Sequence, residues 1–540
     1  MRGASRPHLV LRAAAPRFAI PIALIAGLFQ AFSIASPWDG QAQWWLQVIS
    51  LAALAWLLEQ QPSRRVAALT AWAFGTAWLA GTWWWLFISM HTYGGLPAPL
   101  AALAVLALSA FLALYYAGAG ALYAAARNIP WPMRILNFGA LWLLAELLRN
   151  SLFTGFPWGA SGYAHVDGPL AGLAQYTGVY GISMFTALTA MALVHACAKV
   201  SWKARAAAAV PVAAAWLIAQ AATHCTVSQC HTPAASDPAS AGKISVLLLQ
   251  GNIPQDEKFQ GGTGIPVALQ WYGETLRDAQ DALVVAPETA IPLLPQQLPE
   301  GYWEGLQRRF STGGQAALVG VPLGSLAEGY TNSVIGLKPG APLYRYDKHH
   351  LVPFGEFIPP FFRWFTQMMN IPLGDFNRGT VGQPSFEWSG QRLGANICYE
   401  DLFGDELAAR FADAANAPTV FVNVSNIGWF GDTVAIDQHL NISRMRSLEL
   451  GRPMLRATNT GATVIIDHRG RVTQALPRHA RGTLQGEVEG RLQITPFAAW
   501  ASRFGLWPLW FFGLAVAAAC LGRAHKLSRP SAPAGPDAQA

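Results

Sequence analysis

The stretch from Val66 to Ala126 contains no charged residue, and this feature constrains the fold of the chain most strongly. One membrane-spanning helix needs about 20 consecutive apolar residues, so a stretch of this length can supply two. The chain has 540 residues, of which 52% are hydrophobic and only 12% charged, whereas typical soluble domains are about 25% charged. This composition excludes an intrinsically disordered chain and argues against a wholly soluble one.

The charged residues divide the chain into two parts. Residues 18–222 hold 12 charged residues, whereas residues 223–502 hold 46. The first part has the composition of a membrane domain and the second that of a soluble domain. The net charge is +7, but the basic excess lies at the ends of apolar segments rather than in one patch. We therefore expect no nucleic-acid partner.

Apolar segments predict seven membrane spans before the polar part and one after it. Their cores are residues 18–36, 43–59, 67–89, 98–124, 135–151, 172–196, 206–223 and 503–522. The chain then consists of a basic tail (1–17), a seven-span domain (18–223), a linker (224–242), a polar domain (243–495), the eighth span (503–522) and a disordered tail (523–540). A cleaved signal peptide is the alternative for the first span, because an Arg-rich start precedes it.

Basic residues in the short loops predict how these spans are oriented, because cytoplasmic loops are rich in Lys and Arg. The first tail and the segments after the second, fourth, sixth and eighth spans are basic, which places all five in the cytoplasm. Both termini are then cytoplasmic and the polar domain is extracytoplasmic. There, Cys225 and Cys230 of the linker either form a disulfide or stay free. No zinc-type Cys/His spacing occurs, so we expect no metal and no cofactor.

Residues 243–490 alternate between short apolar runs and helical segments, which is typical of an α/β domain with buried strands. The predicted strands are residues 244–249, 282–286, 316–321, 333–337, 393–397, 419–424 and 462–466. The predicted helices are residues 267–281, 303–311, 405–413 and 436–450. The ends of the strands matter for function, because sites in α/β sheets collect at the carboxyl ends of strands.

Three polar residues stand at such ends. Glu288 and Cys398 come directly after predicted strands, and Lys348 follows the string LYRYD in a strand or hairpin arm. A carboxylate can take the proton of a thiol, the thiolate can attack an acyl carbonyl, and an ammonium can stabilise the oxyanion that forms. Each residue alone has a commoner explanation as a core thiol, a helix-cap or surface carboxylate, or a solvated lysine. Their spacing does not by itself join them into one site.

The strings around these residues are APETAIP with Glu288, YDKHHLVPFGEFIP with Lys348, and ANICYEDLF with Cys398. They resemble the carbon–nitrogen hydrolase (nitrilase) superfamily, whose members carry a Glu–Lys–Cys triad on an αββα sandwich. Further strings extend the resemblance to its membrane branch, the apolipoprotein N-acyltransferase family. These are FTGFPWGASGYAHVDGPL (153–170), LLLQGNIPQDEKF (247–259), SNIGWFGD (425–432) and QHLNISRMRSLELGRPMLRATNTG (438–461). The resemblance implies a polytopic α-helical bundle of eight spans with a nitrilase-like catalytic domain.

The resemblance also implies roles for individual residues. Cys398 would be the nucleophile, Glu288 the general base and Lys348 the oxyanion-stabilising group, with Glu356, Tyr399 and Glu400 as supporting residues. The family usually has Trp after its QDEK string, whereas this chain has Phe259, which keeps the ring but loses the indole N–H. Phe259, Trp429, Phe357 and Trp364 are the predicted substrate- or lipid-binding residues.

Residues 353–376 are rich in Phe, Trp and Met. Beside a membrane this segment is predicted to be an interfacial lid, and the alternative is plain core. The implied reaction moves an acyl chain from a phospholipid, through a cysteine thioester, to the free N-terminal amine of a diacylglyceryl apolipoprotein. We expect phosphatidylethanolamine as donor and a multi-pass protein of the bacterial inner membrane, with its catalytic domain in the periplasm. The rival functions are a membrane-anchored amidase and a non-catalytic scaffold or transporter.

Overall fold

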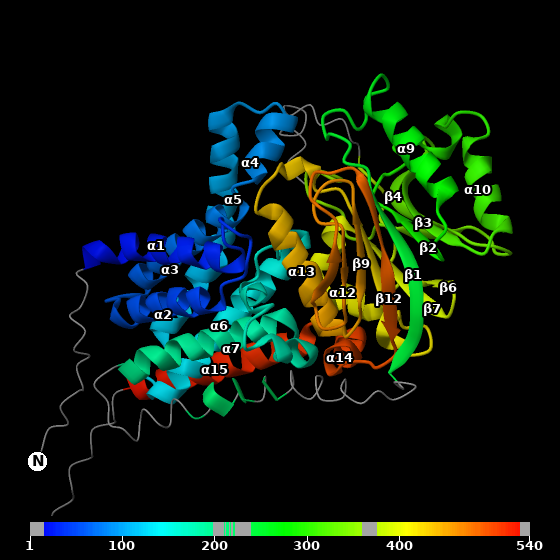
Figure 1. The fold of residues 1–540 in the computed structure, drawn as a ribbon. Helices are drawn as coiled ribbons and strands as arrows, with labels where there is room; N and C mark the ends of the chain where they lie inside the picture. Colours follow the sequence, from blue (N-terminus) through cyan, green and yellow to red (C-terminus); the bar gives the residue numbers. More distant parts are fainter. Residues whose placement is uncertain are drawn as a thin grey trace, which may run out of the picture.

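The structure is a computed structural model that describes residues 16–197, parts of 210–221, 239–358 and 375–529. A helical part packs against a part built on two β-sheets (Figure 1). The N-terminal helices and the C-terminal helix lie together in the helical part, although they come from opposite ends of the chain. Several predicted features lie outside the described residues: Trp364 with most of the lid, Cys225 and Cys230 with most of the linker, and much of the seventh span.

Long apolar runs form the helices of the helical part. They are α1 (Pro16–Ile34), α2 (Trp44–Gln60), α3 (Arg64–Trp83), α4 (Leu86–Ile88), α5 (Ala98–Ala125), α6 (Trp131–Ser151), α7 (Ala174–Cys197), α14 (Pro496–Phe504) and α15 (Trp507–Ser528). The predicted third span is interrupted, because α3 ends at Trp83 and a π-helical turn (Ser89–Tyr93) follows α4. Hydropathy does not reveal this break, since the segment is apolar on both sides of it. At the break, the Trp85 indole turns to a partner in the two-sheet part.

By length and composition, three described segments could cross a membrane: Ala98–Ala125, Ala171–Cys197 and Trp507–Ser528. The apolar segment Phe18–Ile34 is shorter.

Helix α6 carries Arg134, Glu146 and Arg149, and the last two are fully buried inside the bundle. The Arg149 guanidinium donates to the backbone carbonyls of Phe156 and Trp158, both at 2.8 Å. Because only three of the described segments are long and apolar enough, the eight spans remain a prediction.

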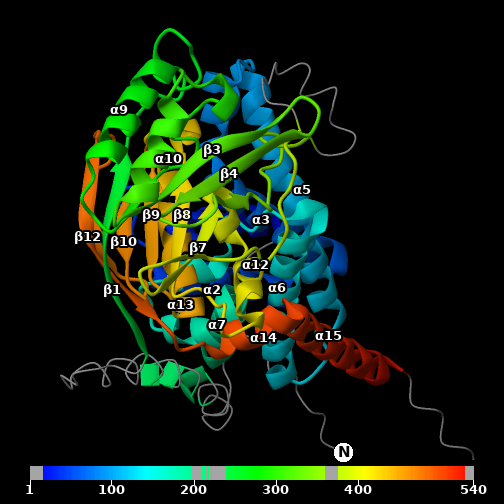
Figure 2. The ribbon, with the colours of Figure 1, turned by 90° about the vertical axis from the view of Figure 1, so that its right-hand side faces the viewer.

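Two six-stranded sheets form the second part (Figure 2). The first has the order β12-β1-β2-β3-β4-β5 and the second the order β11-β10-β9-β8-β7-β6. In each sheet three neighbouring strands are parallel, β1-β2-β3 and β7-β8-β9, and the outer pairs are antiparallel. The strands are β1 (Ser240–Gln250), β2 (Leu283–Ala286), β3 (Ala316–Ser325), β4 (Gly329–Leu337), β5 (Tyr344–Asp347), β6 (Phe386–Trp388), β7 (Gln391–Ile397), β8 (Val420–Ser425), β9 (Met454–Thr458), β10 (Val464–Ile466), β11 (Val472–Ala475) and β12 (Gly482–Arg491).

Alternation of side chains along the strands builds the layers, because successive residues point to opposite faces of a sheet. In β1, Val246 and Leu248 face the core between the sheets, whereas Leu247 and Leu249 face the outer helices. Helices α9 (Gly264–Asp278) and α10 (Tyr302–Thr312) cover that outer face. Helices α12 (Gly404–Ala408) and α13 (Ala435–Leu450) cover the second sheet and continue into the core of the helical part. The result is the predicted α/β sandwich with helices on both outer faces.

All seven predicted strands form, but the sequence analysis missed others. Strand β9 was missed because Arg456 interrupts its apolar run, although that side chain is buried and hydrogen-bonded. Strand β12 was missed because it is polar and half-exposed at the sheet edge. Strand β1 begins at Ser240, inside the segment predicted to be linker.

Gln438 on α13 joins the two parts of the molecule. Its side-chain oxygen accepts hydrogen bonds from the indole N–H groups of Trp85 at 3.0 Å and Trp158 at 2.8 Å. Its side-chain amide donates to the carbonyl of Thr82 at 3.1 Å. Gln438 is buried, so it satisfies three polar groups that water does not reach.

Candidate active site

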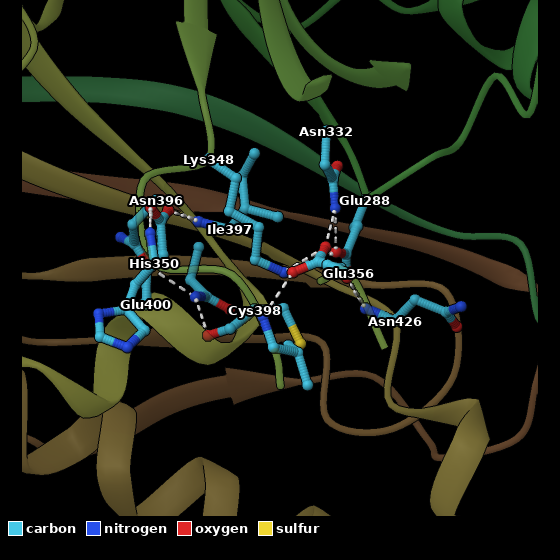
Figure 3. Close-up of polar contacts among 12 residues, drawn as sticks. Glu288, Asn332, Lys348, His350, Glu356, Asn396, Ile397, Cys398, Glu400 and Asn426 are labelled. Atoms are coloured by element: carbon cyan, nitrogen blue, oxygen red, sulfur yellow. Dashed lines mark hydrogen bonds and ion pairs between the residues drawn. The ribbon is translucent and has the colours of Figure 1, made fainter. Parts of the chain in front are cut away.

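The three predicted triad residues follow strands that end at the same edge of the sandwich. Glu288 follows β2 and Lys348 follows β5 of the first sheet, and Cys398 follows β7 of the second. The structure brings all three together with the predicted supporting residue Glu356 (Figure 3). Cys398 has a φ of +50°, a left-handed conformation that costs energy for a residue with a side chain. The sharp turn at the strand end thus points the thiol out of the sheet, toward the other groups.

Lys348 lies between two carboxylates. Its Nζ atom is 3.3 Å from Oε1 of Glu288 and 2.9 Å from Oε1 of Glu356. Burial lowers the pKa of this lysine, but the two carboxylates outweigh burial and raise it above its usual value. Lys348 is therefore an ammonium at neutral pH, fixed in place and shielded from water.

Asn332, which lies in β4 directly before the predicted strand 333–337, holds both carboxylates. Its side-chain amide donates to Oε1 of Glu288 at 2.7 Å and to Oε1 of Glu356 at 2.8 Å. The second oxygen of Glu288 accepts the backbone N–H of Asn426 at 2.9 Å. Burial raises the pKa of Glu288, but Lys348 and the Asn332 hydrogen bond outweigh it, so the net pKa lies below its usual value. Glu288 is thus ionised and able to accept a proton.

Cys398 is a partly buried free thiol. Burial raises its pKa to about 12; the Glu288 carboxylate adds to this effect, while Lys348 opposes it. The resting residue is therefore a neutral thiol, which is a weak nucleophile. A thiol in this state needs a base before it can attack, and Glu288 is an ionised carboxylate near enough to raise the pKa of Cys398.

Glu400 links the turn of Cys398 to the strand end that carries Lys348. One carboxylate oxygen accepts the backbone N–H of Ile397 at 2.7 Å and the hydroxyl of Tyr346 at 2.8 Å. The other accepts the backbone N–H groups of His349 at 2.6 Å and His350 at 3.2 Å. The carboxylate thus holds residues on both sheets through backbone groups.

Tyr399 links the same turn to the helical part of the molecule. Its hydroxyl donates to the carbonyl of Gly155 at 3.1 Å, and its ring stacks on Phe156 with centroids 6.3 Å apart. Tyr399 is buried. The residue after the candidate nucleophile is therefore packed against the loop that carries the string FTGFPWG.

His439 is a further residue at the nucleophile that the sequence analysis did not single out. Its Nδ1 atom lies 2.7 Å from the Arg456 guanidinium, which can only donate, so the ring proton must be on Nε2. That N–H points to the backbone carbonyl of Cys398 at 3.2 Å and to Asp401 at 3.0 Å. Asn423 donates to the same carbonyl at 3.3 Å. Two donors thus fix the main chain of the strained residue.

Three of the four predicted lipid-binding residues are among the described residues, and none of them makes a contact described above. Phe259 is 45% exposed and its ring lies 5.8 Å from Nζ of Lys258. Trp429 packs edge-on against Tyr93 of the helical part, with centroids 5.8 Å apart. The ring of Phe357 is covered by the guanidinium of Arg378.

The sequence analysis also missed Lys258 and Asn332, which contact the triad directly. Lys258 donates to the backbone carbonyl of Glu288 at 3.0 Å and is buried. It stands in the string QDEKF, from which only the aromatic residue was singled out. Asn332 adjoins an apolar strand, and no sequence pattern distinguishes it from an ordinary polar strand residue.

Two family models match the two parts of the chain. A family model described as the apolipoprotein N-acyltransferase N-terminal domain matches residues 26–192, and one for carbon-nitrogen hydrolase matches residues 250–496. An apolipoprotein N-acyltransferase of Verminephrobacter eiseniae (strain EF01-2) is 60% identical over 509 residues, covering 90% of this chain and 93% of the relative. One from Ralstonia nicotianae is 46% identical over 517 residues, covering 94% of each. A crystal structure of a carbon-nitrogen hydrolase from Helicobacter pylori G27 has 15% sequence identity and a TM-score of 0.34, covering 50% of this chain and 95% of that one.

Proposed function

The chain belongs to the apolipoprotein N-acyltransferase family, and we propose that Cys398 carries the acyl group between the two substrates of its reaction. The donor is a phospholipid, and the acceptor is the free N-terminal amine of the lipid-modified cysteine of an apolipoprotein. The product is an N-acylated lipoprotein, and the reaction is the last step of lipoprotein maturation. The observation that carries the proposal is the ionised, lysine-paired Glu288 beside the protonated thiol of Cys398.

In the first half-reaction the Cys398 sulfur attacks the ester carbonyl of the phospholipid. Glu288 takes the thiol proton as the S–C bond forms, and the Lys348 ammonium stabilises the oxyanion. When the ester C–O bond breaks, Glu288 returns the proton to the departing oxygen. The products are a thioester on Cys398 and a lysophospholipid, and Glu288 is ionised again.

In the second half-reaction the neutral α-amine of the apolipoprotein attacks the thioester. An α-amine has a pKa near 8, so a useful fraction is neutral at pH 7. Glu288 takes a proton from the attacking nitrogen as the N–C bond forms and gives it to the sulfur as the S–C bond breaks. The amide leaves and the thiol is regenerated, which gives a ping-pong scheme with one acyl-enzyme.

The membrane supplies the context for these substrates. The apolar segments among the described helices support an integral membrane protein, and the basic loops of the sequence support eight spans with both termini in the cytoplasm. The catalytic domain then lies on the periplasmic side of the inner membrane. The acyl donor there is phosphatidylethanolamine, and Phe259, Trp429, Phe357 and Trp364 contact lipid or substrate. A lid over residues 353–376 keeps water from the thioester.

Intact mass spectrometry of the purified chain with phosphatidylethanolamine tests this function. Wild type should gain the mass of one acyl chain, and Cys398→Ser should gain no adduct that hydroxylamine removes at neutral pH, because that reagent cleaves thioesters. A lipopeptide with a free N-terminus should clear the adduct faster than buffer alone. Equal clearance by buffer would instead indicate a hydrolase. The absence of any adduct with phospholipids would overturn the acyltransferase mechanism.

A further inference from the structure

A second lysine lies at the reaction centre, and the triad mechanism assigns it nothing. Lys258 is 1% exposed, and its Nζ atom donates to the backbone carbonyl of Glu288 at 3.0 Å. A buried ammonium costs several kcal/mol unless nearby negative charge compensates it. Lys258 therefore needs nearby negative charge to remain an ammonium, and the carboxylate of Glu288 supplies it, joined by Cys398 once that thiol is ionised.

Hydrogen bonds fix the backbone around Lys258, and this holds its ammonium group in place. The backbone N–H of Lys258 donates to the carbonyl of Pro254 at 2.9 Å, which closes a turn after β1. Asn459 anchors the start of this turn through both the N–H and the carbonyl of Ile253, at 3.1 Å and 2.9 Å. The side-chain amide of Asn459 also donates to the side chain of Asn426, whose backbone N–H holds the Glu288 carboxylate.

Four charged side chains contact Glu288 or Lys348 directly in this cluster, and their charges balance only when Lys258 is counted. Glu288 and Glu356 bring two negative charges, and Lys348 alone brings one positive charge. Without Lys258 the site would carry a net negative charge before the reaction starts. Every step of the proposed reaction then adds or moves negative charge, first as a thiolate and then as an oxyanion. A second cation lowers the electrostatic cost of placing this negative charge in the buried site.

We propose that Lys258 is a positioning residue that holds Glu288 from its main-chain side and balances the charge of the Cys398 thiolate. The proposal deepens the proposed function and rests on it for the acylation step alone. Burial lowers the pKa of Lys258 to about 8, with Glu288 and Cys398 opposing this effect. The ammonium form therefore prevails at pH 7 and is lost above about pH 8. Electrostatic effects between two groups are mutual, so the ammonium in turn favours the thiolate.

Alkylation of Cys398 by iodoacetamide tests the charge effect without any substrate. The full chain in detergent is compared as wild type, Lys258→Met and Lys258→Arg over a range of pH, with Cys398 followed by peptide mass spectrometry. Lys338→Met is the matched control, because Lys338 also donates to one backbone carbonyl, that of Glu387 at 2.7 Å, but near the surface and away from the triad.

Below pH 8, where Lys258 of the wild type is an ammonium, Lys258→Met should slow both Cys398 alkylation and acyl-enzyme formation about 10-fold. Lys258→Arg should keep the wild-type alkylation rate below pH 8. Because arginine stays charged, acyl-enzyme formation in this variant should no longer decline above about pH 8. Lys338→Met should match wild type in both assays. A wild-type alkylation profile in Lys258→Met would overturn the proposal, because the thiol would then not sense the charge.

Lys258→Arg decides the question if Lys258→Met does not purify as folded protein. Slower alkylation of Cys398 in Lys258→Arg than in wild type below pH 8 would overturn the proposal. The shape of the lysine side chain, and not its charge, would then be what matters. The alkylation assay also separates this proposal from the proposed function. If wild type forms no acyl adduct while Lys258→Met still shifts the alkylation profile, the acyltransferase mechanism fails and the role of Lys258 stands.

Discussion

Glu400 accepts the backbone N–H of His349 over 2.6 Å, so the carboxylate two residues after Cys398 holds the residue that follows Lys348. The same carboxylate accepts the N–H of Ile397, the residue before Cys398. One side chain therefore sets the distance between the strand ends that carry the thiol and the ammonium. This explains how a glutamate that touches no reacting atom can matter for the chemistry.

Glu400→Gln should slow acyl-enzyme formation by about 10- to 100-fold, because one carboxylate oxygen becomes an amide that cannot accept its two donors. Tyr346→Phe removes a single donor to the same carboxylate and should slow acyl-enzyme formation far less. Time-resolved intact mass spectrometry of the acyl adduct measures both rates. Equal rates in Glu400→Gln and wild type would refute the positioning role of this carboxylate.

Asn332→Leu should move the acid limb of acyl-enzyme formation to higher pH. The net pKa of Glu288 lies below its usual value of about 4.5. The basic carboxylate form is therefore present above that value, and the rate falls only as pH drops below it. Loss of the Asn332 donor removes one cause of the lowered pKa. The pH profile of adduct formation checks this shift, and an unchanged acid limb would show that Asn332 does not tune Glu288.

Gly320→Ala should lower both stability and the acylation rate. A Cβ atom at Gly320 would lie 2.2 Å from the carbonyl oxygen of Pro287 and 2.8 Å from Cα of Glu288. Because these neighbours are backbone atoms, they must move, and Glu288 moves with them. We expect a loss of about 1–3 kcal/mol in the free energy of unfolding. Gly314→Ala, where the added atom meets nothing within 4 Å, is the control and should be nearly neutral.

Gln438→Met should loosen the contact between the helical part and the two-sheet part. The change leaves the indole N–H groups of Trp85 and Trp158 and the carbonyl of Thr82 without this partner. We expect a loss of at least about 3 kcal/mol in the free energy of unfolding, since three buried polar groups are left unpaired and each costs about 1–3 kcal/mol. Thermal unfolding in detergent measures it, with Gln270→Met on the exposed face of α9 as control. Equal melting temperatures in the two variants would contradict this assignment.

Strand ends and the family resemblance together predicted the site. Glu288 and Cys398 stood out because they follow short apolar runs, whereas the resemblance of the surrounding strings joined them to Lys348, and all three meet in the structure. Lys258 was within the quoted string but could not be assigned a role, since a lysine in a loop is usually solvated. Here it is buried, which depends on how the turn after β1 packs against the segment after β2.

The sequence by itself determined the division of the chain, since charge density separates an apolar helical part from an α/β part without any contact being known. It also determined seven of the strands, because buried strands must be apolar. Only the tertiary structure decided which polar residues become neighbours, as with Asn332 and His439, and where Arg456 finds the partners that allow it inside a strand. The physical reason is that hydropathy reports on contact with water, whereas hydrogen bonds and charge pairs depend on distances set by packing.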